Sequence, residues 1–189
     1  MARLHLGTGF LAAVIIFTAG TIAGWVFSRV IAPLLVPSLE NLVTTAEKTM
    51  GLNPEIGHLA LSAFIFLKNL SVTAILVFVG HVACALPAMF ILVVNGLLVG
   101  LLARYFVEAG LPPAAFVAGI APHGVIELPA LFLAAGLALA IAAQQLKGGV
   151  TPGFGRRLDF LLRVVTPLLA AAAVVEVYIT PLVINRFAP

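Results

Sequence analysis

Long uncharged apolar stretches recur along this 189-residue chain, and they restrict its fold more than any other feature. They cover residues 8–28, 59–67, 69–103, 111–126, 128–146 and 164–175. Hydrophobic residues make up 62% of the chain and charged residues 9%, whereas a soluble domain carries about 25% charged residues. Because a helix needs about 20 apolar residues to cross a bilayer, the chain holds about five crossings. The runs are continuous rather than alternating, which excludes a transmembrane barrel.

The sequence therefore predicts an all-α, polytopic transmembrane helical bundle that forms a single integral membrane domain over residues 1–189. The expected spans are residues 9–30, 60–83, 87–106, 123–145 and 158–184. The run at 69–103 would form a helix of about 52 Å, too long for one crossing, so we expect a hairpin near Pro87. Cys84 lies beside this break and, as the lone cysteine, has no partner for an internal disulfide.

Residues 111–121 form a shorter apolar segment between Pro112-Pro113 and Pro122. As a helix this segment would span about 17 Å, roughly half the hydrocarbon thickness. We therefore expect a re-entrant or half-helix that turns back at Pro122. The polar insert at residues 37–57 is predicted to lie on the outer side and to contain a short amphipathic helix.

Basic residues predict the orientation of the bundle in the cell membrane. Four of them lie between the fourth and fifth expected spans: Lys147, Arg156, Arg157 and Arg163. This loop should be cytoplasmic, which with five spans makes the N-terminus cytoplasmic too. The first apolar run ends without a small-x-small cleavage site, so we interpret it as an uncleaved span. The net charge of +3 is spread over the loops, and the absence of a basic stripe argues against a nucleic-acid partner.

One segment inside the apolar sequence carries the strongest functional signal, Ala-Pro-His-Gly-Val-Ile-Glu-Leu-Pro-Ala at residues 121–130. His123 and Glu127 share one helix face there, about 6 Å apart along the axis. A charged group at the bilayer centre costs roughly 3 kcal/mol or more, so such residues usually mark a site. Glu176 is the other acid well within a span. The candidate intramembrane polar site comprises His123, Glu127, Glu176, Asn95, Asn69 and His81.

Three interpretations of this site are open on the sequence alone. In the first, His123, Glu127 and Glu176 tie helices together through buried hydrogen bonds, with protonated carboxyl groups donating to carbonyls that nearby prolines leave without partners. In the second, the same residues titrate along the path of a small channel or transporter. In the third, they bind a metal, with His81 as a further ligand, in an intramembrane hydrolase; the usual metalloprotease pattern is missing. No catalytic triad, nucleotide motif or cofactor motif is present, so we expect neither an enzyme nor a cofactor.

Two pairs of glycines have the small-xxx-small spacing that lets membrane helices approach closely. Gly20 and Gly24 lie in the first span, and Gly96 and Gly100 lie in the third. A small bundle needs only one such face internally. We therefore expect a homodimer in the lipid bilayer that uses at least one of these glycine faces.

The chain resembles the SpoIIM (stage II sporulation protein M) family of integral membrane proteins over approximately residues 9–184. Four features carry this resemblance: residues 66–69, the Asn-Gly-Leu-Leu-Val-Gly segment at 95–100, the Pro-His-Gly-Val-Ile-Glu-Leu-Pro segment at 122–129, and Glu176. Lys68-Asn69 stands where the family pattern has paired asparagines. The resemblance implies a five- or six-span membrane protein without recognised catalytic activity. Our first functional hypothesis is therefore a non-enzymatic membrane scaffold or anchor that docks partner proteins, ahead of a channel or transporter and of a metal-dependent hydrolase. Sporulation members of the family act with two cell-wall-degrading partners, so cell-wall hydrolases are candidate partners here.

Overall fold

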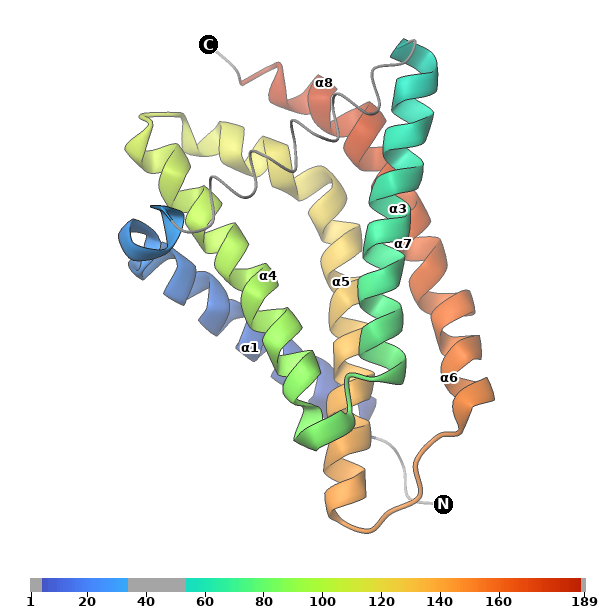
Figure 1. Cartoon of the computed structure of the whole chain (residues 1–189). Coiled ribbons are helices and arrows are strands. Elements are labelled where there is room, and N and C mark those ends of the chain that lie inside the picture. Colours follow the sequence, from blue (N-terminus) through green and yellow to red (C-terminus); the bar gives the residue numbers. More distant parts are fainter. Residues whose placement is uncertain (1–4, 34–53, 188–189) are drawn as a thin grey trace.

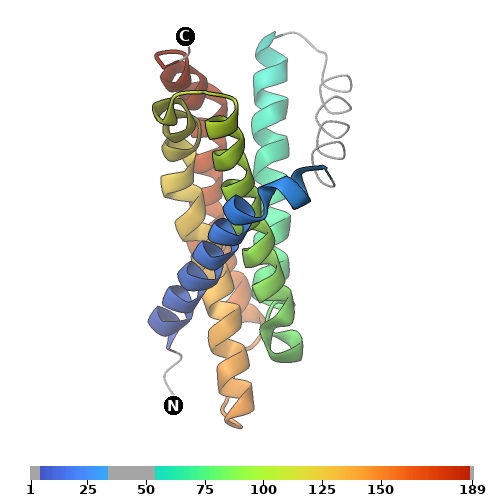
Figure 2. The ribbon, with the colours of Figure 1, turned by 90° about the vertical axis from the view of Figure 1, so that its left-hand side faces the viewer.

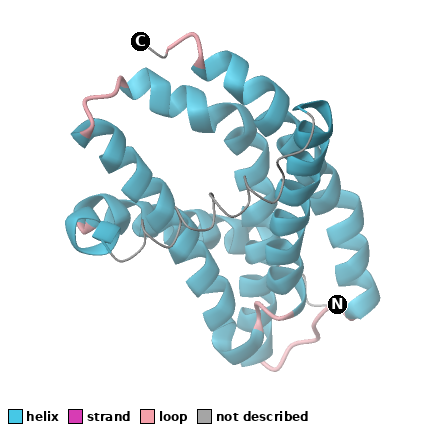
Figure 3. Cartoon of the chain, turned by 45° about the horizontal axis from the view of Figure 1, so that its top comes forward, coloured by secondary structure: helices cyan, strands magenta, loops and turns pink. Residues whose placement is uncertain are grey.

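Figure 1 shows the computed structural model of the chain, which describes residues 5–33 and 54–187. Four long helices come first: α1 (Leu6–Val26), α3 (Pro54–Phe78), α4 (Val82–Glu108) and α5 (Pro113–Leu146). The C-terminal helix is continuous but changes its winding along its length. Its segments are α6 (Phe154–Phe160), the π-helix η1 (Leu161–Val165), α7 (Thr166–Val174), the π-helix η2 (Val175–Ile179) and α8 (Thr180–Ile184). The described residues contain no strand, which confirms the all-α prediction (Figure 3).

Five helices are long and apolar enough to cross a membrane, as the apolar runs predicted. They cover Leu6–Val26, Gly57–Phe78, Val82–Glu108, Pro113–Leu146 and Phe154–Ile184. The fourth begins at Pro113 instead of His123, because the expected half-helix belongs to it. An amphipathic helix is predicted in the polar insert at residues 37–57. Residues 37–53 of this insert lie outside the described residues.

Helix α5 is the centre of the bundle and contacts α1, α3, α4 and the C-terminal helix. Figures 1 and 2 show α1 crossing α4 and α5 on one side, with α3 and α7 on another. Small side chains make this central position possible. Ala130, Ala134, Ala135 and Ala138 are all fully buried, and they let neighbouring backbones approach α5 closely.

The predicted turn at Pro122 is wrong. Residues 113–121 are helical, but they continue through Pro122 and Pro129 as one helix without a break. Figure 1 shows the N-terminal arm of α5 bent away from the rest of the helix. A proline removes one backbone hydrogen bond and its ring crowds the preceding turn, which bends a helix without ending it when neighbouring groups accommodate the freed carbonyl.

The predicted hairpin between the second and third spans is confirmed. Helix α3 ends at Phe78, and regular helical geometry resumes only at Leu86, just before Pro87. In between, Ala83, Cys84 and Ala85 have φ values of 48°, 58° and 66°. This left-handed conformation costs an L-residue roughly 1–2 kcal/mol, so the turn stores backbone strain.

The two glycine faces meet each other inside the chain. The contacts pair Gly20 with Val93, Gly24 with Leu97, Gly96 with Phe17 and Gly100 with Thr21. These pairs also show that α1 and α4 run parallel. A β-carbon at Gly20 would lie 2.6 Å from the carbonyl oxygen of Val93, so the backbones nearly touch. The expectation that one glycine face is left over for a homodimer is therefore wrong.

Candidate functional site

Three ionisable side chains from two distant parts of the chain converge beside α5. His123 and Glu127 project from one face of α5, and Glu176 belongs to η2 of the C-terminal helix. One imidazole nitrogen and one carboxylate oxygen from each acid all lie within 4.8 Å of one another. All three residues are half-buried. The structure thus brings together three of the six residues in the candidate polar site, and we call them the central cluster.

His123 is also linked to a residue that the sequence reasoning missed. Its Nδ1 lies 3.4 Å from Oγ1 of the buried Thr180. The Thr180 hydroxyl also reaches the carbonyl oxygen of Val175, to which it donates at 3.3 Å. While it does so, it accepts from His123 in the tautomer that carries the imidazole proton on Nδ1. The other ring nitrogen, Nε2, then carries the free lone pair.

A π-helical turn precedes Thr180 and contains Glu176. The same arrangement occurs one segment earlier, where Thr166 donates to the carbonyl oxygen of Leu161 at 2.9 Å after η1. In both cases a Thr-Pro pair follows five π-helical residues, and the threonine bonds five positions back. Proline cannot donate to its own helix, and the wider turn accommodates this loss. The repeated Thr-Pro pair was the sequence signal that could have identified Thr180.

Asn69 brings a third helix, α3, to the central cluster. This side chain is 8% exposed and lies near the carboxyl group of Glu127. The neighbouring Lys68 is exposed, and its positive charge also acts on Glu127. Glu127 therefore has polar partners from α3 and from the C-terminal helix.

Asn95 lies on the other side of α5, across a pocket. This pocket has a volume of about 240 Å³, and it is lined on the α4 side by Asn95 and on the α5 side by His123 and Glu127. Its remaining lining is apolar, from Phe17, Leu98, Val99, Leu102, Ile120, Gly124, Leu128 and Leu131. The Asn95 amide nitrogen donates to the carbonyl oxygen of Ile91 at 2.8 Å. His123 and Glu127 thus border a half-open pocket between the helices that is large enough for several water molecules.

Comparison with known proteins identifies the family. The family model described as stage II sporulation protein M, SpoIIM, matches residues 13–181. The chain belongs to the SpoIIM family. No curated protein and no solved structure gives a match. The match runs from α1 into α8, so it includes the whole central cluster together with Asn69, Asn95 and Thr180.

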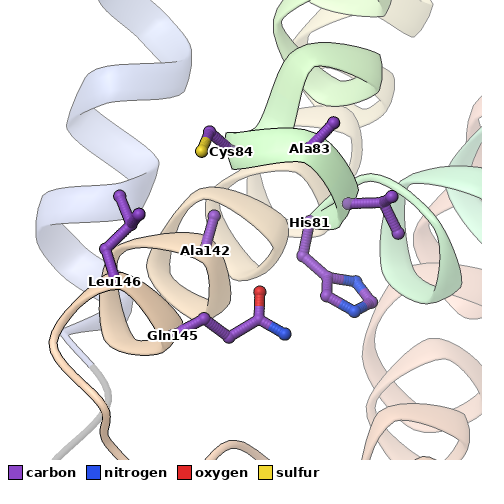
Figure 4. Close-up of a pocket in the computed structure, with 7 residues that line it drawn as sticks. His81, Ala83, Cys84, Ala142, Gln145 and Leu146 are labelled. Atoms are coloured by element: carbon purple, nitrogen blue, oxygen red, sulfur yellow. The ribbon is translucent and has the colours of Figure 1, made fainter.

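His81 lies apart from the central cluster of this SpoIIM protein, which corrects its grouping with the other five residues. It follows α3 in the turn before α4, and it lines a separate pocket of about 370 Å³ with Cys84 and Gln145 (Figure 4). Its Nδ1 is buried and has no hydrogen-bond partner among the described residues. Burial, followed by the positive charge of Arg157, lowers the pKa of His81 below its usual value. This histidine belongs to one end of the bundle.

The central cluster of this SpoIIM protein has a defined electrostatic requirement. Two carboxyl groups and one imidazole lie together between helices that are long and apolar enough to cross a membrane. Two negative charges at this separation repel strongly where the dielectric constant is low. They need a proton or a bound cation to compensate them. The chemistry available to this site is therefore the binding and release of positive charge.

Proposed function

We propose that this SpoIIM protein is a small channel or transporter, and that the central cluster is the cation-binding site along its pathway. One observation carries the proposal, the half-open pocket of about 240 Å³ between α1, α4 and α5 that reaches His123 and Glu127. Acids in membrane helices that border a cavity between the helices are typical of ion and proton pathways. The two π-helical turns of the C-terminal helix support the same function, because such turns are frequent at functional sites.

Flux measurements on the purified full chain in liposomes test this proposal. An imposed pH or cation gradient should dissipate faster than in protein-free liposomes, and Glu127→Gln or Glu176→Gln should reduce the rate at least tenfold. Glu108→Gln is the matched control, because Glu108 pairs with Arg29 and Arg104 near the end of α4, away from the central cluster. Flux equal to that of protein-free liposomes, or equal in all variants, would overturn the proposal.

The proposed topology has a cytoplasmic N-terminus, and the structure supplies an argument for it. Thr8 at the start of α1 lines a pocket together with Lys147 at the end of α5. The start of α1 therefore lies at the same end of the bundle as the basic loop between α5 and α6. The positive-inside rule assigns that end to the cytoplasm. Labelling of a cysteine at Gly7 and of one at Gly153, in a Cys84→Ser background, should occur from the same side.

A second candidate function is a non-enzymatic membrane anchor that docks partner proteins such as cell-wall hydrolases, including a sporulation-related role. Membership of the SpoIIM family favours this candidate. We include a homodimer in the anchor candidate, formed through a surface other than the glycine faces. The native mass of the protein in lipid nanodiscs tests whether it is a dimer. One variant, Glu127→Gln, distinguishes the two candidate functions. If Glu127→Gln restores hydrolase localisation in cells that lack the protein, the anchor is favoured over the channel or transporter.

A further inference from the structure

We infer that the cation held by the central cluster is a divalent first-row transition-metal ion, with Zn²⁺ as the representative case. His123, Glu127 and Glu176 would each supply one ligand atom. This inference rests on the proposed role of the cluster as a cation site and names the chemical class of its ligand. Four independent properties of the described residues carry it: ligand spacing, donor type, charge and supporting contacts.

The spacing of the three donor groups fits a single ion. At metal–ligand distances of about 2.0–2.2 Å, two ligands of one ion lie roughly 3.0–4.3 Å apart, depending on their geometry. The candidate donor atoms all lie within 4.8 Å of one another. In the tetrahedral geometry of Zn²⁺ two ligand atoms lie about 3.4 Å apart, so the largest separation closes by up to about 1.4 Å on binding, which rotations of the two glutamate side chains supply.

The donor set selects the class of metal. One imidazole nitrogen and two carboxylate oxygens suit zinc, manganese and related transition metals. Calcium and magnesium prefer sites built from oxygen atoms alone. His123 adds to this preference because Thr180 occupies Nδ1, which leaves Nε2 with its lone pair available.

Charge balance favours a divalent ion over a monovalent one. Two carboxylates and one neutral imidazole carry a total charge of −2, which one divalent ion cancels. A sodium ion, a potassium ion or a single proton would leave one negative charge on the three ligands, opposed only by the exposed Lys68 among the described residues near Glu127. An unbalanced charge is costly in a low-dielectric surrounding, whereas a neutral complex is not.

Buried neighbours of the central cluster match the outer contacts that orient metal ligands. Thr180, 9% exposed, contacts the ring of His123 at 3.4 Å, and Asn69, 8% exposed, lies near the carboxyl group of Glu127. Metal-binding histidines and carboxylates usually have such partners, whose loss weakens binding about 10–100-fold. The adjacent pocket provides room for water or substrate at an open coordination position, which is the mark of a metal site that does more than hold the fold together.

Cobalt titration of the purified full chain tests the metal directly, without measuring transport. Co²⁺ added to the chelator-treated protein should produce visible absorption bands that saturate at one ion per chain, and Zn²⁺ should displace it. Glu127→Gln and Glu176→Gln should each weaken binding at least 100-fold, and Thr180→Val about tenfold. His81→Gln and Glu108→Gln are the controls and should leave binding unchanged.

Several outcomes would overturn the metal inference. The first is the absence of the Co²⁺ absorption bands in the wild-type protein, and the second is their persistence in both glutamine variants. The third is a thiolate charge-transfer band, which would assign the bound Co²⁺ to Cys84. Glu176→Asp keeps a carboxylate and should bind Co²⁺ more weakly than wild type but more tightly than Glu176→Gln, which covers the case of a poorly folded glutamine variant. Cobalt binding without flux in liposomes would overturn the channel or transporter and keep the metal site. Flux that depends on Glu127 in a protein that binds no Co²⁺ would overturn the metal site and keep the channel or transporter.

Discussion

His123 and Thr180 are 57 positions apart in the chain, yet His123 Nδ1 lies 3.4 Å from Thr180 Oγ1. This contact joins the central helix α5 to the end of η2 and holds the ring of His123 beside Glu127 and Glu176. It depends on the π-helical turn, because Thr180 reaches both Val175 and His123 only where the helix is widened before Pro181. The position of His123 in the central cluster therefore depends partly on the backbone geometry of η2.

Thr180→Val should remove the hydroxyl without changing the side-chain size. The loss of a buried hydrogen-bond partner for His123 should lower the free energy of unfolding by about 1 kcal/mol. Thr180→Ser keeps the hydroxyl and should stay within about 0.5 kcal/mol of the wild type. Unfolding in mixed micelles, followed by circular dichroism, measures both variants. Equal stability of the valine variant would show that the hydroxyl contributes nothing to the fold.

Gly24→Ala should destabilise the bundle by about 1–3 kcal/mol, because the added β-carbon would overlap the carbonyl of Leu97 in α4. Gly7→Ala in the same helix is the control. Nothing lies within 4 Å of a β-carbon at Gly7, and alanine favours a helix over glycine by up to about 1 kcal/mol. Opposite signs for the two variants in a thermal unfolding measurement are expected. A dimer that dissociates on Gly24→Ala while each chain keeps its stability would contradict the internal packing.

Cys84→Gly should stabilise the protein. Cys84 is exposed and has a φ of 58°, which glycine adopts without the steric cost that an L-residue bears. After subtraction of the extra entropy of glycine in the unfolded chain, a gain of about 0.5–1 kcal/mol remains. Ala88→Gly, in regular helix and fully buried, is the matched control and should lose about 1 kcal/mol or more. A loss in both variants would mean that the left-handed turn is unstrained.

The stability of the protein should fall below neutral pH through His81. Burial and the charge of Arg157 lower the pKa of His81 from 6.5, so below about pH 6.5 the unfolded chain binds more protons than the folded one. Stability therefore rises with pH in the window between the folded pKa and 6.5, and it is lost as the pH decreases through that window. His81→Gln should flatten this part of the profile of melting temperature against pH, whereas His58→Gln should leave it unchanged. An unchanged slope in His81→Gln would assign the pH dependence to another group.

The sequence determined the features that depend on local composition and spacing. Apolar runs of sufficient length required five membrane helices, and Pro87 placed the hairpin, because a span must end where its length exceeds the bilayer. The four-residue spacing of His123 and Glu127 put both on one face of a helix, which is a property of the helix itself. The same pattern carried the resemblance to SpoIIM that the family match confirms.

Only the tertiary structure decided which of these features meet. It brought Glu176 and Thr180 to His123, left His81 at one end of the bundle, and joined the glycine faces of α1 and α4 within one chain. A small-xxx-small face has the same sequence whether its partner helix belongs to the same chain or to a second copy. A proline such as Pro122 ends a helix or only bends it, depending on whether neighbouring groups accommodate the freed carbonyl. Both outcomes depend on packing between segments far apart in the sequence, and local spacing carries no information about that packing.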